Sequence, residues 1–158
     1  IVTGWLYVAI PFVLLFNLSV LDSAAYDYIL PLSVLIFIWT NDTFAYLIGR
    51  MIGKTPLFKR ISPNKTVEGT LGGLLCVGIA AYIFSTQSDY FNPVQWIGLG
   101  LTAAVFGSLG DLVESMLKRS LNIKDSGNIL PGHGGLLDRF DATLLASPFV
   151  YAYVLLIS

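Results

Sequence analysis

The segment Tyr28–Ile48, YILPLSVLIFIWTNDTFAYLI, decides the class of fold, because it is 21 residues long and holds one charged residue, Asp42. A helix that crosses a bilayer needs about 20 mostly apolar residues. Backbone N–H and C=O groups surrounded by lipid must be paired within the segment, so the expected form is an α-helix. The segment therefore predicts a transmembrane helix with a carboxylate inside it.

Four other stretches have a similar length and apolar character. The predicted spans are Val2–Val20, Tyr28–Ile48, Val67–Thr86, Pro93–Leu117 and Leu136–Ile157. Hydrophobic residues make up 55% of the chain and charged residues 12%, against about 25% charged residues in soluble domains. The sequence predicts an all-α, polytopic integral membrane bundle with about five transmembrane helices, in one catalytic domain over residues 1–158.

The chain begins at Ile1 inside an apolar run, with no basic segment and no small-residue cleavage site. We therefore expect no signal peptide, and a membrane domain that is truncated at its N-terminus. The single cysteine, Cys76, also lies in an apolar run, which excludes a disulfide framework and a cysteine-based metal site.

The basic residues predict the orientation in the membrane. They follow span two, follow span four or open span five: Arg50, Lys54, Lys59, Arg60, Lys65, Lys118, Arg119, Lys124 and Arg139. The loops after spans one and three hold only Asp22, Asp27 and Asp89. Because cytoplasmic loops carry an excess of Lys and Arg, the basic loops are expected to be cytoplasmic.

Five acidic residues fall within or beside the spans: Asp42, Asp111, Glu114, Asp138 and Asp141. Charges in a membrane are costly, and they usually face a bundle interior or a wet cavity. Asp42 and Asp111 each lie six residues before the end of their span, about 9 Å inside its cytoplasmic end. Asp138 and Asp141 lie in the first turns of span five, on the same side. We expect these carboxylates to share one polar pocket near the cytoplasmic headgroups.

Charge alone leaves two uses for this pocket. The first is a metal site, since Mg²⁺ is typically bound by one or two carboxylates together with substrate phosphates. The second is a proton or ion pathway, which also uses carboxylates inside the membrane. Asp138 and Asp141 share a helix face, as do Asp111 and Glu114. Glu114 is either a ligand or the partner of Lys118 at i+4, and the sequence leaves both open.

Two basic, glycine-containing helix entrances favour a phosphate substrate. Residues 62–69, SPNKTVEG, precede span three, and PGHGG at 131–135 precedes span five. Glycine permits close approach of a backbone, and a helix N-terminus offers free N–H groups to an anion. Beside a carboxylate cluster, these entrances indicate a metal-bound phosphate.

The chain carries SMLKR at 115–119, KDSG at 124–127 and LPGHGGLLDRFD at 130–141, with Gly110-Asp111 upstream and further motif residues between Asn41 and Gly69. Together these motifs resemble the C-terminal part of the phosphatidate cytidylyltransferase (CDP-diacylglycerol synthase) family. It covers about Trp39 to Ala142. Phe44 and Val67 depart from the family pattern, which more often has a small residue and Trp there, and this leaves the shape of the substrate pocket open.

The resemblance implies that CMP is transferred from CTP to phosphatidate, giving CDP-diacylglycerol and pyrophosphate in phospholipid biosynthesis. It implies Mg²⁺, with a possible second cation, held by Asp111, Asp138 and Asp141, and Lys65 as a further catalytic residue. The implied substrate-binding residues are Lys118, Arg119, Lys124, His133, Gly134, Gly135, Arg139, Asp42 and Glu68.

The expected partners are CTP, phosphatidate and the lipid bilayer, with a homodimer as a further assembly to test and no nucleic acid. The expected location is the bacterial inner (plasma) membrane, with the active site facing the cytoplasm. Two other functions stay open. One is a CTP-dependent lipid kinase of the polyprenol or dolichol type, and the other is an ion-coupled transporter, in which PGHGGLLDRFD has no evident role.

Overall fold

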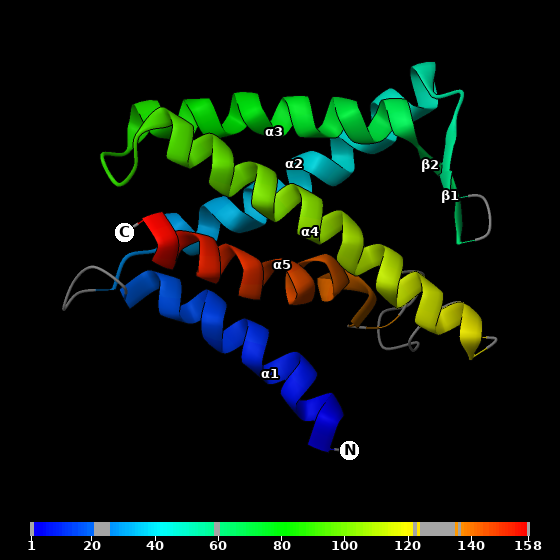
Figure 1. Cartoon of the computed structure of the whole chain (residues 1–158), viewed down its shortest axis with the longest axis horizontal. Coiled ribbons are helices and arrows are strands. Elements are labelled where there is room, and N and C mark those ends of the chain that lie inside the picture. The colour runs from blue at the N-terminus through cyan, green and yellow to red at the C-terminus, as the bar shows by residue number, and fades with distance from the viewer. Residues whose placement is uncertain are drawn as a thin grey trace.

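The computed structural model describes residues 2–20, 26–58, 61–121, 123, 135 and 137–157. The elements in these ranges are α1 (Val2–Asn17), η1 (Leu18–Val20), α2 (Ile29–Ile52), β1 (Pro56–Phe58), β2 (Ser62–Thr66), α3 (Val67–Gln87), α4 (Pro93–Ser120) and α5 (Leu137–Ile157). The helices pack into a bundle, and the two strands form a hairpin at one end of it (Figure 1).

Helices α2 to α5 are each long and apolar enough to cross a membrane. This confirms the prediction of an all-α polytopic membrane bundle, and the chain is an integral membrane protein. Helix α1 belongs to a shorter apolar stretch, Gly4–Val20, so the number of five spans stays a prediction. Helix α4 continues three residues beyond the predicted end, to Ser120, with Lys118 and Arg119 in its last turn. Cations there are favourable because the C-terminal end of a helix carries partial negative charge.

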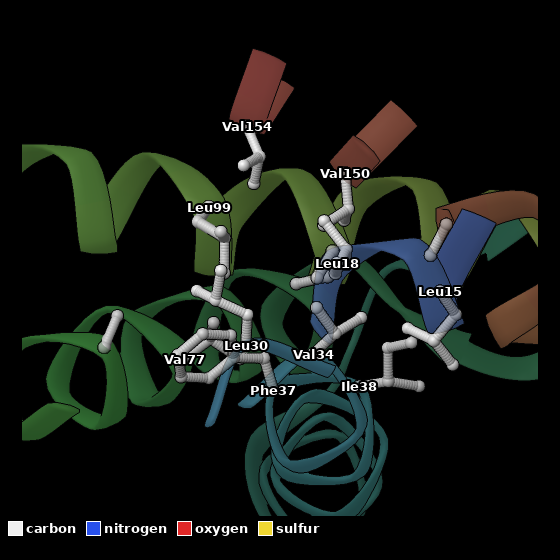
Figure 2. Close-up of a cluster of buried hydrophobic side chains, with 14 of the residues drawn as sticks. Leu15, Leu18, Leu30, Val34, Phe37, Ile38, Val77, Leu99, Val150 and Val154 are labelled. Atoms are coloured by element: carbon white, nitrogen blue, oxygen red, sulfur yellow. The ribbon is translucent and has the colours of Figure 1, made fainter. Parts of the chain in front are cut away.

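The centre of the bundle is an apolar core to which α2, α3, α4 and α5 contribute. Phe37, Val77, Leu99 and Val150, one from each of these helices, are fully buried and belong to one cluster (Figure 2). Helix α1 packs along α5, on the side of the bundle remote from α3 (Figure 1). Many large apolar side chains point outward, Leu156 at 85% exposure among them, as expected where lipid replaces water.

Glycines bring helix backbones into direct contact at two places. A Cβ on Gly69 would lie 2.5 Å from the carbonyl oxygen of Ala45, so α3 has no room for a side chain against α2. A Cβ on Gly73 would lie 2.9 Å from the carbonyl oxygen of Asn41 in the same helix. A Cβ on Gly110 of α4 would lie 2.6 Å from the carbonyl oxygen of Asp141 in α5. Small residues between membrane helices permit such close packing.

The antiparallel hairpin between α2 and α3 was not predicted. Pro56 pairs with Thr66 and Phe58 with Ser62. Thr66 ends β2 and also caps α3, because its side-chain oxygen accepts a hydrogen bond from Gly69 N at 3.1 Å. The hairpin therefore fixes Lys65 at the start of α3.

Candidate active site

A polar cavity of about 340 Å³ opens between α2, the hairpin, α3, α4 and α5. Its polar lining comprises Asn41, Asp42, Tyr46, Asn64, Lys65, Thr66, Thr70, Ser108, Asp111, Asp138 and Asp141. Five predicted site residues thus meet at one cavity: four carboxylates and Lys65. Asp111 reaches the α5 carboxylates because Gly110 allows α4 and α5 to approach backbone to backbone.

Lys65 forms an ion pair with Asp111 across the cavity wall. Its Nζ lies 2.5 Å from Asp111 Oδ2, and both side chains keep about a third of their surface exposed. The other oxygen of Asp111 accepts a hydrogen bond of 3.2 Å from Ser115 Oγ. This pair joins the hairpin to α4.

Lys118 lies between two carboxylates. Its Nζ is 2.6 Å from Asp138 Oδ1 and 3.3 Å from Glu114 Oε1, and its side chain is 16% exposed. The second oxygen of Asp138 accepts a hydrogen bond of 2.7 Å from Gly135 N. Pairing of Glu114 with Lys118, one of the two alternatives left open above, is confirmed. Glu114 is buried and does not line the cavity.

Four polar lining residues lie outside both the predicted site residues and the predicted entrance 62–69. They are Asn41, Tyr46, Thr70 and Ser108. Asn41 donates from Nδ2 to Ser108 Oγ at 2.9 Å, which links α2 to α4 beside the carboxylates. The available signal was spacing, because Ser108 lies three residues before Asp111 on the same helix face and Asn41 directly precedes Asp42.

Glu68 serves the hairpin and does not line the cavity. Its carboxylate accepts hydrogen bonds of 3.2 Å from the backbone N–H groups of Lys54 and Thr55. The first N–H groups of α3 are also occupied, since Val67 N donates to Thr55 O and Gly69 N to the Thr66 side chain. These two amides are therefore not free for a phosphate, contrary to what the sequence of this entrance suggested.

The remaining predicted residues lie elsewhere. Arg119 is exposed in the last turn of α4 and Arg139 is exposed in the first turn of α5, and neither lines the cavity. Gly135 is buried and contributes its backbone N–H to Asp138. Lys124, His133 and Gly134 fall outside the described residues.

The donor set fits a hard divalent cation. Among the described residues, ion pairs with lysine reach Asp111 and Asp138, whereas Asp42 and Asp141 have none, so anionic oxygen is in excess around the cavity. Mg²⁺ prefers such oxygens and usually shares them with substrate phosphates. No three acidic, histidine or cysteine side chains in the described ranges are close enough to hold an ion by themselves. A cation here would thus draw further oxygens from water or from a substrate.

Comparison with known proteins agrees with the sequence motifs. Residues 1–157 match the model of the Cytidylyltransferase family. The phosphatidate cytidylyltransferase of Bacillus subtilis (strain 168) is 45% identical over 156 residues, which cover 97% of this chain and 56% of the relative. Those of Staphylococcus aureus (strain COL) and Staphylococcus saprophyticus are 51% identical over 117 residues and 46% identical over 146, covering 73% and 91% of this chain and 45% and 54% of the relatives. The chain spans about half the length of these curated relatives.

Proposed function

The chain belongs to the cytidylyltransferase family, and from this premise we propose that it carries the active site of a CTP-dependent phosphatidate cytidylyltransferase. The reaction would transfer CMP from CTP to phosphatidate, releasing pyrophosphate. The observation that carries the proposal is the cavity in which Asp42, Asp111, Asp138 and Asp141 meet Lys65. Carboxylates for a cation and a lysine for a phosphate are the groups that nucleotidyl transfer needs at one place.

The bonds of the reaction are simple to balance. A phosphate oxygen of phosphatidate forms a P–O bond to the α-phosphorus of CTP, and the bond from the α-phosphorus to the bridging oxygen breaks. The electron pair leaves with pyrophosphate. Catalysis then depends on holding two anionic substrates in line and on neutralising their charge.

Mg²⁺ would be held by carboxylates from the set Asp111, Asp138 and Asp141 together with substrate oxygens, and would neutralise charge on the transferring phosphates; a second cation is a further prediction. Asp42 faces the same cavity from α2 and would add negative potential for the cation. Lys65 would bind a phosphate of CTP as a point charge. The Asn41–Ser108 hydrogen bond keeps α2 and α4, and so Asp42 and Asp111, at a fixed separation.

The position of the cavity suits a lipid substrate. Asp42 and Asp111 lie in the C-terminal halves of α2 and α4, and Asp138 lies in the first turn of α5, so the cavity lies toward one end of the membrane helices. We place this end on the cytoplasmic side of the bacterial inner membrane, because the basic residues gather in the loops there. The headgroup of phosphatidate and cytoplasmic CTP would meet at that depth. A homodimer is a further prediction.

The destination of a label tests the proposal against the CTP-dependent lipid kinase. The full-length protein in detergent is given Mg²⁺ and either α-labelled CTP with phosphatidate or γ-labelled CTP with a polyprenol. We expect α-label in the lipid and unlabelled pyrophosphate, with no transfer by Asp141→Asn and normal transfer by the control Lys54→Ala. Transfer of γ-label without α-label would establish the kinase instead. If folded protein transferred neither α-label nor γ-label to a lipid, the proposal would be refuted and the transporter hypothesis would remain.

A further inference from the structure

We propose that Lys65 is a resident counter-ion of Asp111, which a divalent cation displaces, so that Lys65 turns to a nucleotide phosphate only after the cation has bound. This inference rests on the proposed function and adds an order of events to it. Before a cation binds, Lys65 competes with it for Asp111. After the cation has bound, Lys65 and the cation both bind phosphates of the nucleotide.

The two lysines of the site are held very differently. Lys118 lies between two carboxylates, and one of them, Asp138, is fixed further by the N–H of Gly135. Lys65 has a single carboxylate partner, Asp111, and its side chain is more exposed, at 28% against 16% for Lys118. Lys65 can therefore leave its partner at low cost, whereas Lys118 cannot leave without stranding buried charge.

Lys65 can leave without moving the backbone. The next residue, Thr66, pairs with Pro56 in the hairpin and caps α3 through its hydrogen bond from Gly69 N. The main chain next to Lys65 is thus anchored both to β1 and to the start of α3. Its side chain is a flexible four-carbon stem with a compact charge, which can change partners by rotation alone.

A divalent cation that binds Asp111 repels the ammonium of Lys65. Lys65 Nζ lies 2.5 Å from Asp111 Oδ2, and Oδ1 accepts a hydrogen bond from Ser115 Oγ. A cation on either oxygen of this carboxylate would lie close to the ammonium, and the repulsion between like charges at such distances favours departure of the ammonium. The released ammonium remains beside the cavity, where phosphates attract it.

This arrangement has a signature that separates it from simpler roles. Removal of the Lys65 charge should strengthen binding of a metal in the absence of nucleotide, because the competitor is gone. A lysine that only binds phosphate would leave metal binding unchanged. If Lys65 only extended its charge to the membrane surface, its replacement would change the binding of neither the metal nor the nucleotide.

Binding of Mn²⁺ to the full-length protein, followed by electron paramagnetic resonance without nucleotide, measures the competition. We expect Lys65→Met to lower the Kd for Mn²⁺ roughly fivefold or more, the size of a typical coupling between two ligands. Lys65→Arg should retain the wild-type Kd, because it keeps the cation. Lys54→Met, an exposed lysine of the same connection, is the matched control and should change nothing. An unchanged or higher Kd for Lys65→Met, equal tightening in Lys54→Met, or absence of Mn²⁺ binding in every variant would overturn the proposal.

A second measurement uses the unmodified protein and so does not depend on how the variants fold. The reactivity of each lysine toward an amine-directed reagent is measured by mass spectrometry with and without Mg²⁺. We expect Mg²⁺ to raise the reactivity of Lys65, which is freed from its carboxylate, and to leave that of Lys54 unchanged. Constant or lower reactivity of Lys65 would refute the displacement. Neither measurement contains CTP, so a failure of CMP transfer refutes the proposed function separately.

Discussion

The Nζ of Lys118, near the end of α4, lies 2.6 Å from Oδ1 of Asp138, in the first turn of α5. Glu114 lies on the other side of the same ammonium, at 3.3 Å. These two carboxylates are mostly buried, so the lysine compensates charge that water cannot reach. We infer that Lys118 holds the α4–α5 junction together, and that this role limits its freedom to bind a phosphate.

The first prediction concerns the stability of this junction. Lys118→Met should lower the free energy of unfolding by about 2–4 kcal/mol, because it leaves two buried carboxylates without their cation. Thermal unfolding in detergent measures the loss. Addition of Glu114→Gln to this variant removes one stranded charge and should recover part of the stability. A variant as stable as the wild type but with a raised KM for CTP would show instead that Lys118 binds phosphate.

The second prediction separates two aspartates that the sequence treats alike. Asp141→Asn and Asp138→Asn should both abolish CMP transfer, but only Asp138→Asn should also lower the melting temperature. The reason is that Asp138 accepts bonds from Lys118 and from Gly135 N, whereas Asp141 makes no lysine or arginine ion pair within the described ranges. Activity and melting curves of the same preparations test this. Equal melting temperatures for the two variants would contradict it.

The helices and the meeting of the carboxylates were predictable because both follow from local sequence. Twenty apolar residues specify a span, and the distance of Asp42 and Asp111 from the span ends specifies their depth. The tertiary partners were not predictable. Glu68 has the residue type of a ligand, yet it accepts from the Lys54 and Thr55 backbone. The i+4 pair of Lys118 with Glu114 was one of the predicted alternatives, but its second partner, Asp138 of α5, was not predictable.

The hairpin escaped prediction for a physical reason. Its strands contain Pro56 and Pro63, and proline removes a backbone donor, so the sequence lacks the alternating pattern of an ordinary strand pair. Contacts with the neighbouring helices compensate, since β2 packs against α2 and α3. Tertiary packing, which no local pattern encodes, therefore sets the position of Lys65.

The third prediction concerns the contact between α2 and α3. Gly69→Ala should destabilise the protein by about 1–3 kcal/mol, because the new Cβ would lie 2.5 Å from the carbonyl oxygen of Ala45, which cannot move aside. Gly78→Ala, on the same helix, is the matched control, since a Cβ there meets no atom within 4 Å. Unfolding in detergent compares the two. Gly78→Ala should be neutral or stabilising, because alanine favours a helix more than glycine does. Similar losses in both variants would mean that the close contact with Ala45 does not set the effect.

The fourth prediction concerns pH, at the end of the bundle opposite the cavity. Asp27 accepts hydrogen bonds from the Tyr90 hydroxyl and from Ile29 N, and these hold the pKa of Asp27 below its ordinary value of 3.8. A lowered carboxyl pKa contributes stability above the unfolded pKa, and this contribution is lost as the pH falls through the folded pKa. Tyr90→Phe should therefore lower the melting temperature near pH 7, and the difference from wild type should narrow below about pH 3.8.

Tyr82→Phe is the control for that experiment, because Tyr82 is exposed and its hydroxyl makes no hydrogen bond to any described residue. It should leave the melting temperature unchanged at every pH. A difference for Tyr90→Phe that stays constant from pH 7 to pH 3 would show that the contact acts through packing of the ring and not through the charge of Asp27.

The last prediction concerns the path of the chain through the membrane. Helix α3 has 21 residues and is about 32 Å long, which matches a hydrocarbon core of about 30 Å. Ser62 lies in the hairpin before α3, beside the basic residues, and Ser88 follows the helix on the side that carries acidic residues. Single cysteines at these two positions, in a Cys76→Ala background, should therefore react with an impermeant thiol reagent from opposite sides. We expect Ser62→Cys to react only from the cytoplasmic face and Ser88→Cys only from outside, because positive charge is retained in the cytoplasm. Labelling of both positions from one side would mean that α3 does not cross, and the alternation of all the predicted spans would then fail with it.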